Sequence, residues 1–165
     1  MNNPDAPLIR PAVKSDLKTL LQLNNAAVPA VNDLTTSELA DLIASAAVCL
    51  VAEQNGRIDG FLLCLREGSA YDSRNYQWLS RERKHFAYTD RICVAAHSRG
   101  KRIGEQLYQA LFEREKNTGR SFVCEVNERP PNHGSLKFHK RLGFQEIGRQ
   151  DHGDKAVVYL ERTNG

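Results

Sequence analysis

The sequence has no pair of cysteines at the spacing of a zinc or redox motif. Its four cysteines, Cys49, Cys64, Cys93 and Cys124, each lie inside an apolar, strand-like run. None of its five histidines shows metal-ligand spacing. We therefore expect buried, reduced thiols and no metal site. A nucleophilic Cys93 or Cys124 acting with His139 is an alternative that no motif supports.

Long apolar runs and long basic runs are also missing. No stretch reaches the roughly 20 apolar residues that a membrane-spanning helix needs. The first residues lack the charged-then-apolar pattern of a secretory signal. The net charge is only +3, and the basic residues are scattered. We therefore expect a cytoplasmic protein without a membrane or nucleic-acid partner.

The chain is long enough for a real hydrophobic core. Its 165 residues contain 41% hydrophobic and 26% charged residues, as in ordinary globular proteins. We see no internal repeat, low-complexity tract or linker. The sequence therefore predicts a single domain covering residues 1–165.

The most informative stretch runs from Asp90 to Lys116. It begins as a strand, with Ile92 and Val94 on one face and Cys93 on the other. A helix follows, because apolar residues recur on one face between 103 and 111. The two are joined by a basic, glycine-bearing loop.

That loop consists of Arg99, Gly100, Lys101, Arg102, Ile103 and Gly104. Backbone N–H groups at the helix start, the helix dipole and three cations together favour a bound anion, most commonly a phosphate. An ordinary strand–helix connection with a solvated basic surface is the alternative interpretation.

The rest of the chain alternates between strand and helix patterns. We expect strands at 8–10, 48–52, 58–65, 86–95, 122–127, 144–149 and 156–161. We expect helices that begin near residues 16, 35, 103 and 132. Ser15 or Asp16 should cap the first, Thr35 and Glu38 should form a capping box for the second, and Asn132 should cap the last, which Gly143 ends. Asn55 and Gly56 predict a hairpin turn. This order predicts an α/β fold in which a mixed sheet carries helices on both faces.

The segment 66–84 is a long connection for a compact domain. It places three aromatic residues, Tyr71, Tyr76 and Trp78, among many charged ones. Long connections are frequently functional, so a lid over a substrate is one interpretation. The other is a surface excursion whose aromatic side chains fold back on the core.

The basic loop resembles the pyrophosphate-binding loop of the GCN5-related N-acetyltransferase (GNAT) superfamily. The family pattern is Gln or Arg, two residues, Gly, one residue, then Gly or Ala. Arg99 and Gly104 fit its first and last positions. Arg102 stands where the family most often has Gly, and the nearby Gly100 restores part of the lost backbone freedom.

A second motif resembles the part of the family in which coenzyme A is clasped between a strand and a helix. It comprises Asn127, Asn132, Ser135 and the run FHKRLGF at 138–144. Many members have Tyr where this chain has His139. The two motifs lie in the family's order, and the resemblance covers nearly the whole chain.

The resemblance implies a GNAT fold with a mostly antiparallel central sheet and acetyl-CoA as the cofactor. It implies transfer of an acetyl group to a primary amine on a small molecule or a protein, and it makes a homodimer a possible partner arrangement. The basic loop would bind the diphosphate, and a backbone N–H of Ile92, Cys93 or Val94 would polarise the thioester. Asn127, Asn132 and Ser135 would contact coenzyme A.

The same resemblance suggests two catalytic residues. Asp90 lies near where several members carry a carboxylate base, with His85 and Glu125 as weaker candidates. His139 stands where tyrosine often serves as the general acid, or it merely hydrogen-bonds the cofactor. Two other functions stay open: a non-catalytic acyl-CoA-binding sensor or partner module, and a nucleotide-binding α/β domain.

Overall fold

The computed structural model describes residues 6–164, and the chain divides into two compact units. Unit 1 comprises the chain up to Cys64 together with Arg91–Arg114. Unit 2 comprises Leu65–Asp90 and the chain from Glu115 onward. Each unit therefore draws on two stretches of sequence, and the single domain expected over 1–165 stays a prediction.

Over residues 6–164 the strands form a seven-stranded sheet in the order β1-β2-β3-β4-β5-β7-β6. They are β1 (Leu8–Pro11), β2 (Val48–Gln54), β3 (Arg57–Arg66), β4 (Phe86–Val94), β5 (Ser121–Arg129), β6 (Gln145–Asp151) and β7 (Ala156–Arg162). Strands β4 and β5 are parallel, whereas β1–β2, β2–β3, β5–β7 and β6–β7 are antiparallel. The mixed, mostly antiparallel α/β fold is confirmed.

The helices are α1 (Leu17–Ala26), α2 (Thr36–Ser45), α3 (Arg74–Glu82), α4 (Ile103–Glu115) and α5 (His133–Arg141), with single turns η1 (Lys14–Asp16) and η2 (Ala96–Ser98). In the described part of the chain, no helix has the length and apolar character to cross a membrane.

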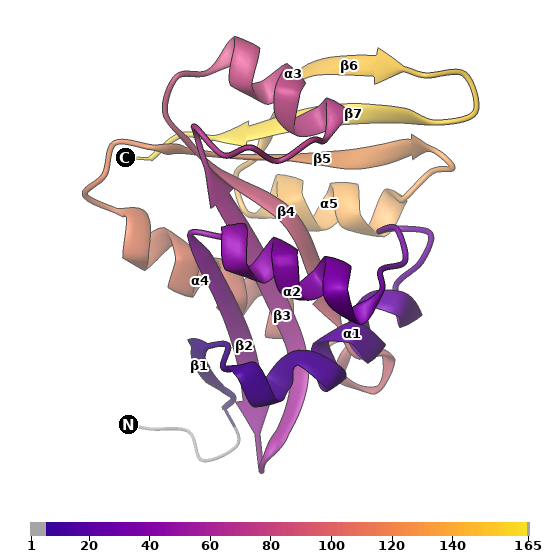
Figure 1. The fold of residues 1–165 in the computed structure, drawn as a ribbon. Helices are drawn as coiled ribbons and strands as arrows, with labels where there is room; N and C mark the ends of the chain where they lie inside the picture. Colours follow the sequence, from indigo (N-terminus) through magenta and orange to yellow (C-terminus); the bar gives the residue numbers. More distant parts are fainter. Residues whose placement is uncertain (1–5, 165) are drawn as a thin grey trace. The chain divides into compact units, whose positions relative to one another are not determined.

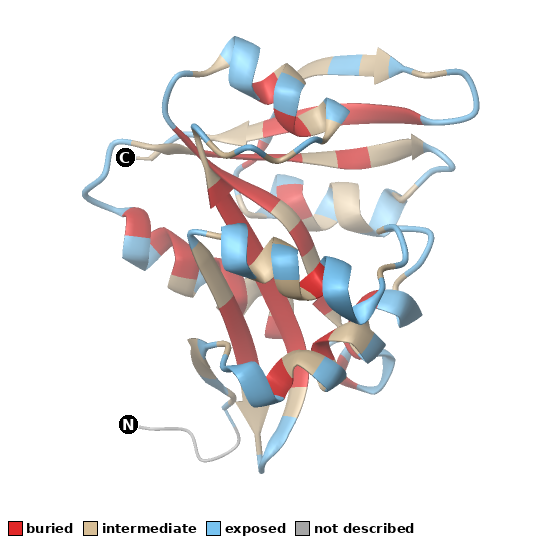
Figure 2. Cartoon of the chain, in the orientation of Figure 1, coloured by how far each residue is buried: buried red, intermediate tan, exposed pale blue. Residues whose placement is uncertain are grey.

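In unit 1, helices cover the strands on two sides. Figure 1 shows α1 and α2 in front of β2 and β3, with α4 behind them. Buried residues lie along these strands and on the helix faces turned toward them, whereas the outer helix faces are exposed (Figure 2). Leu20 and Leu39 from the front helices and Leu107 from α4 have no exposed surface. These apolar faces hold the helices to the sheet.

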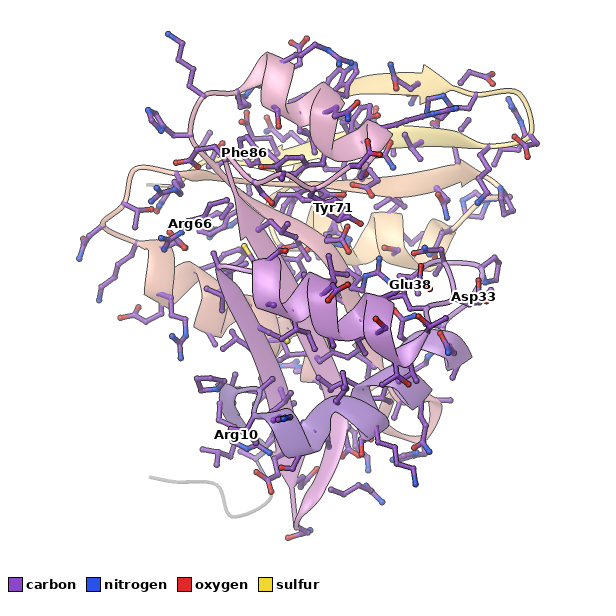
Figure 3. The ribbon with its side chains drawn as sticks, in the orientation of Figure 1. Arg10, Asp33, Glu38, Arg66, Tyr71 and Phe86 are labelled. Carbon is purple, nitrogen blue, oxygen red and sulfur yellow. The ribbon has the colours of Figure 1, made fainter. Side chains whose placement is uncertain are left out.

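The start of α2 and the β2–β3 turn follow the sequence closely. Thr35 Oγ1 accepts the N–H of Glu38, and the Glu38 carboxylate accepts the N–H of Thr35, which is the expected capping box. Glu38 is labelled in Figure 3. Asn55 and Gly56 both have positive φ, at 52° and 75°, as a two-residue hairpin turn requires.

The start of α1 differs from the prediction. We expected Ser15 or Asp16 to cap the helix, but no side-chain cap is present at the Asp16 position. The Asp16 carboxylate instead accepts the N–H of Val13 and two hydrogen bonds from Arg10. Arg10 is labelled in Figure 3. The hydrogen bonds from Arg10 hold the pKa of Asp16 below its ordinary value. The Asp16 carboxylate therefore pairs with the Arg10 guanidinium and does not cap α1.

Unit 2 contains a helix that the sequence did not reveal. The segment expected to be a connection between residues 66 and 84 contains α3, whose start is capped by Ser73. Tyr76 is buried in contact with the rings of Tyr71, Phe86 and Tyr88. The apolar positions of α3 are few, so its period is hidden among charged residues.

The packing of α3 favours the surface-excursion interpretation of this segment over the lid. The indole of Trp78 stacks on the ring of Tyr159 in β7, with centroids 4.0 Å apart and planes 4° from parallel. Gly148 in β6 lies beneath the same indole, where an added Cβ would be 2.6 Å from two indole carbons. The missing side chain at Gly148 therefore makes room for the helix.

Helix α5 covers the other face of β7. Arg162 donates a hydrogen bond to the carbonyl of Leu142 at the end of α5, whereas Tyr159, three positions away, contacts α3. Residues an odd number of positions apart on a strand point to opposite faces. Gly143 ends α5 with a φ of +93°, as expected for a glycine in the left-handed position.

Replacing Gly148 with Ala should destabilise the protein by about 1–3 kcal/mol, because the new methyl group must displace the indole of Trp78. Chemical unfolding would measure this loss. Gly134→Ala is the matched control: it lies in α5, a Cβ there meets nothing within 4 Å, and alanine favours a helix. Equal stability of both variants would show that the stack does not depend on the glycine.

Candidate functional site

The basic loop lies in unit 1, between the end of β4 and the start of α4. The turn η2 leads into the loop, and in this turn the Ser98 N–H donates to the Ala95 carbonyl, 2.9 Å. Within the loop, the Lys101 N–H donates to the Ser98 carbonyl, 3.3 Å. Arg99, Gly100, Lys101 and Arg102 are exposed, and Ile103 begins the helix. The predicted strand–loop–helix order is therefore present.

Arg102 adopts the backbone conformation for which glycine is favoured. Its φ is +61°, and Gly100 two residues earlier has a φ of +83°. A non-glycine residue in this left-handed region costs about 1–2 kcal/mol. The expectation that Gly100 would compensate for the residue at 102 is therefore incomplete, because the chain turns left-handed at both positions.

The loop and the first turn of α4 offer the features that an anion requires. Within residues 6–164, no acceptor is found for the backbone N–H groups of Arg102, Ile103, Gly104 and Glu105. Such N–H groups at a helix start carry partial positive charge. The exposed guanidinium and ammonium groups of the loop add full positive charges. The residues present therefore fit a phosphate-bearing ligand.

Two of the expected cofactor-binding residues point their side chains into the core. Cys93 and Ile103 are each 2% exposed, whereas Ile92 and Val94 are half-buried. This alternation matches the strand pattern read from the sequence. A ligand could therefore meet Cys93 and Ile103 only through their backbone groups.

The remaining predicted site residues lie in unit 2, and a chain of hydrogen bonds links four of them. Asn132 donates its N–H to the carbonyl of Asn127, 3.0 Å, and its side-chain oxygen accepts the N–H of Ser135, 3.2 Å. Ser135 in turn contacts His139 through its carbonyl. The predicted N-cap at Asn132 is therefore confirmed, and the end of β5 is tied to the first turn of α5.

His139 is buried, and one of its nitrogens is committed to the backbone. Nδ1 lies 2.8 Å from the Ser135 carbonyl, which can only accept, so Nδ1 carries the proton in the neutral ring. The rings of Phe138 and Phe144 lie nearly perpendicular to the imidazole, at centroid distances of 5.2 and 5.3 Å. Burial lowers the pKa of His139, against a smaller opposing effect of the Ser135 carbonyl. The imidazole is therefore neutral at pH 7 and a poor proton donor.

Asp90 is half-buried near the middle of β4. Glu125, a weaker candidate for the base, lies on the neighbouring strand β5, and the Tyr88 hydroxyl lies 2.9 and 2.8 Å from its two carboxylate oxygens. Asn75 from α3 also donates to Glu125, and Tyr159 donates to Asn75. The sequence did not reveal this network, because its members are far apart in the chain.

His85, the other weak candidate, has a side chain that is 73% exposed, and its Nδ1 lies 3.4 Å from Glu67. Glu67 also accepts hydrogen bonds from Arg120 and from the Phe86 N–H. Burial alone would raise the pKa of Glu67, but these hydrogen bonds outweigh it and lower the pKa to about 2. His85 therefore sits beside a structural ion pair.

A second network, in unit 1, also went unpredicted. The guanidinium of Arg91 is buried and donates to the side-chain oxygens of Asn24, 2.7 Å, and Asn32, 3.1 Å. Asn24 donates in turn to the Asn32 carbonyl and to Asn25. The signal was an asparagine on the apolar face of α1, because a buried amide needs partners. This network fixes the segment between α1 and α2.

None of the four cysteines forms a disulfide. Cys64, Cys93 and Cys124 are buried as expected, and Cys49 is half-buried. Burial raises the pKa of the Cys49 thiol to about 12. Among the described residues, no group of His, Cys, Asp and Glu side chains could hold a metal ion.

These features define a class of protein: an α/β fold whose strand–loop–helix unit has the exposed N–H groups and cations that suit a phosphate-bearing ligand. The profile of the acetyltransferase (GNAT) family matches residues 17–144. The chain therefore belongs to this family.

A curated relative is an uncharacterized N-acetyltransferase of Methanocaldococcus jannaschii, 34% identical over 97 residues. The match covers 58% of this chain and only 38% of that protein.

Two solved structures show the same fold. Ard1 from Thermoplasma volcanium superposes with a TM-score of 0.76 at 17% identity, covering 96% of this chain and 97% of that one. An N-acetyltransferase from Staphylococcus aureus gives a TM-score of 0.72 at 25% identity, covering 96% and 99%.

His139 should titrate below the ordinary histidine pKa of about 6.5, because burial disfavours its charged form. Nitrogen-15 NMR of the imidazole should also find the proton on Nδ1 at pH 7. A ring that is protonated on both nitrogens at pH 7 would contradict this prediction and restore His139 as a proton donor.

Proposed function

We propose that this protein is an N-acetyltransferase that uses acetyl-CoA and transfers the acetyl group directly to a primary amine. The observation that carries the proposal is the loop 99–104, whose left-handed turn, unpaired N–H groups and cations suit a diphosphate. Family membership supplies the class of reaction. The acceptor is an amine on a small molecule or a protein.

The cations and backbone N–H groups of unit 1 have two roles in this proposal. Arg99, Lys101 and Arg102, with the N–H groups that begin α4, hold the diphosphate. A backbone N–H of the segment 92–94 donates to the thioester oxygen, where negative charge develops during transfer. When bound, acetyl-CoA supplies an acetyl group activated as a thioester.

The second motif contributes to the same proposal. Asn127, Asn132 and Ser135 provide polar groups at the end of β5 and the first turn of α5, where they contact coenzyme A. His139 acts as a structural support for this turn, because its protonated nitrogen faces the Ser135 carbonyl. This assignment differs from both roles that the sequence left open, which were a general acid and a hydrogen-bonding partner of the cofactor.

Asp90 is the proposed base. An amine has a pKa near 10, so an acceptor reaches the site protonated and must lose that proton before it attacks. Glu125 is the alternative. Its carboxylate accepts hydrogen bonds from Tyr88 and Asn75, which hold it in place.

A non-catalytic acyl-CoA-binding module is the second candidate. The specific observation in its favour is the neutral, buried imidazole of His139, in place of a tyrosine that could donate a proton. Selective binding of acetyl-CoA with no transfer to any amine in a broad panel would support it.

Acetyl-CoA should bind the purified protein selectively over ATP and NAD, and isothermal titration would measure this. Charge reversal of Arg99 and Arg102 together should weaken binding at least about tenfold, because the diphosphate loses two cations. Arg102→Gly is the matched variant, since glycine keeps the left-handed turn and removes only one charge. It should cost only a few-fold. Unchanged affinity after charge reversal would exclude the loop as the diphosphate site.

Asp90→Asn should lower kcat by about a hundredfold or more at neutral pH, with acetyl-CoA affinity unchanged, as expected for loss of a general base. The deficit should shrink as the pH approaches 10, because the amine then deprotonates without help. Rates would be measured with the best acceptor from a panel of small amines and short peptides. Glu125→Gln is the control, and a larger deficit in that variant would transfer the role to Glu125.

A further inference from the structure

Two consecutive residues of β3, Asp59 and Gly60, contact the two ends of the segment that carries the anion-binding loop. We infer that Asp59 and Gly60 are positioning residues, which hold this loop in its binding geometry without touching the ligand. The inference rests on the proposed function for its consequence in binding, but the contacts themselves are independent of any ligand.

Asp59 owes its orientation to an irregularity in the sheet. Along β2 and β3, Ala52 pairs with Gly60 and the next residue, Glu53, pairs with Ile58. Asp59 is therefore the extra residue of a β-bulge and has no partner on β2. Bulges redirect a side chain out of the regular alternation. Here the carboxylate is redirected toward the turn η2 that precedes the loop.

Asp59 holds that turn by its backbone and by its side chain. Its carbonyl accepts the N–H of Ala95, 2.8 Å, and its carboxylate oxygen lies 3.2 Å from Nε2 of His97. The carboxylate has no exposed surface, and Arg57 donates to it at 2.8 Å. A buried carboxylate requires such partners, so the pairing with His97 is built into the fold.

Gly60 holds the other end of the segment. A Cβ at this position would lie 3.0 Å from Cγ2 of Ile103, the first residue of α4, and 3.0 Å from the carbonyl oxygen of Cys93. Because glycine has no Cβ, β3 approaches the helix start more closely than a larger residue would allow without a shift of Ile103. Ile103 is thereby seated on β3 and buried, and its N–H belongs to the proposed anion site.

Between these two fixed ends the loop has little freedom. It must reverse direction through left-handed conformations at Gly100 and Arg102, and Arg102 adopts its own at a cost in energy. A strained turn persists only when its surroundings determine it. The contacts of Asp59 and Gly60 fix the two ends of this turn, so the loop already has its binding conformation before the ligand binds.

The test compares His97→Ala with Arg57→Ala. Both variants remove one partner of the Asp59 carboxylate, but only His97 belongs to the turn that leads into the loop. Amide hydrogen exchange of the ligand-free protein would be followed at residues 95–104, and acetyl-CoA affinity would be measured by titration. His97→Ala should speed exchange in this segment and weaken binding by about threefold to tenfold, whereas Arg57→Ala should change neither appreciably.

A second variant probes the other end. Gly60→Ala should also speed exchange at 95–104, because Ile103 must shift by a few tenths of an ångström to admit the methyl group. Unchanged exchange in both His97→Ala and Gly60→Ala would overturn the inference. Faster exchange with unchanged acetyl-CoA affinity would overturn the positioning role. Failure of the unmodified protein to bind acetyl-CoA would instead overturn the proposed function, with the exchange data still deciding the loop contacts.

Discussion

The close approach of β3 to the start of α4 is the constraint on which the proposed anion-binding loop depends. The absence of a side chain at Gly60 allows Ile103 to lie against the strand, and this contact fixes the first N–H groups of the helix. Those N–H groups have no acceptor within residues 6–164, so they are available to a ligand. They keep a fixed position because Ile103 is held against β3. The left-handed turn at Arg102 then follows, because the chain must enter a helix whose position is already determined.

Much of this arrangement was predictable from the sequence, because local patterns determine most of the elements. The strand alternation around Cys93, the capping box at Thr35, the cap at Asn132 and the glycine that ends α5 all appear as expected. Each depends on interactions within a few residues, so each leaves a readable pattern. The residues of the loop pointed to an anion, and the family resemblance added the identity of that anion as a diphosphate and the second motif.

The features that could not be predicted depend on residues far apart in the chain. Helix α3 is held by the Trp78–Tyr159 stack above Gly148, a contact among three separate segments. The carboxylate of Asp59 reaches His97 only because a bulge redirects it. Local propensity does not encode such pairings. The sequence offered only a weak indication, the asparagine at position 24 on the apolar face of α1, which the structure shows to be buried.

The replacement of the family's tyrosine by His139 does not by itself exclude catalysis. A thiol has a pKa near 8.5, so a thiolate that leaves at neutral pH gains its proton readily, including from water. Deprotonating an amine whose pKa is near 10 is the harder task, and the proposed function assigns it to the carboxylate of Asp90 or, as the alternative, of Glu125. With a buried, neutral imidazole in place of tyrosine, the protein lacks a donor only for the easier proton transfer, the one to the leaving thiolate. Its hydrogen bond to the Ser135 carbonyl gives it a separate reason to be present, as a support for the turn that begins α5.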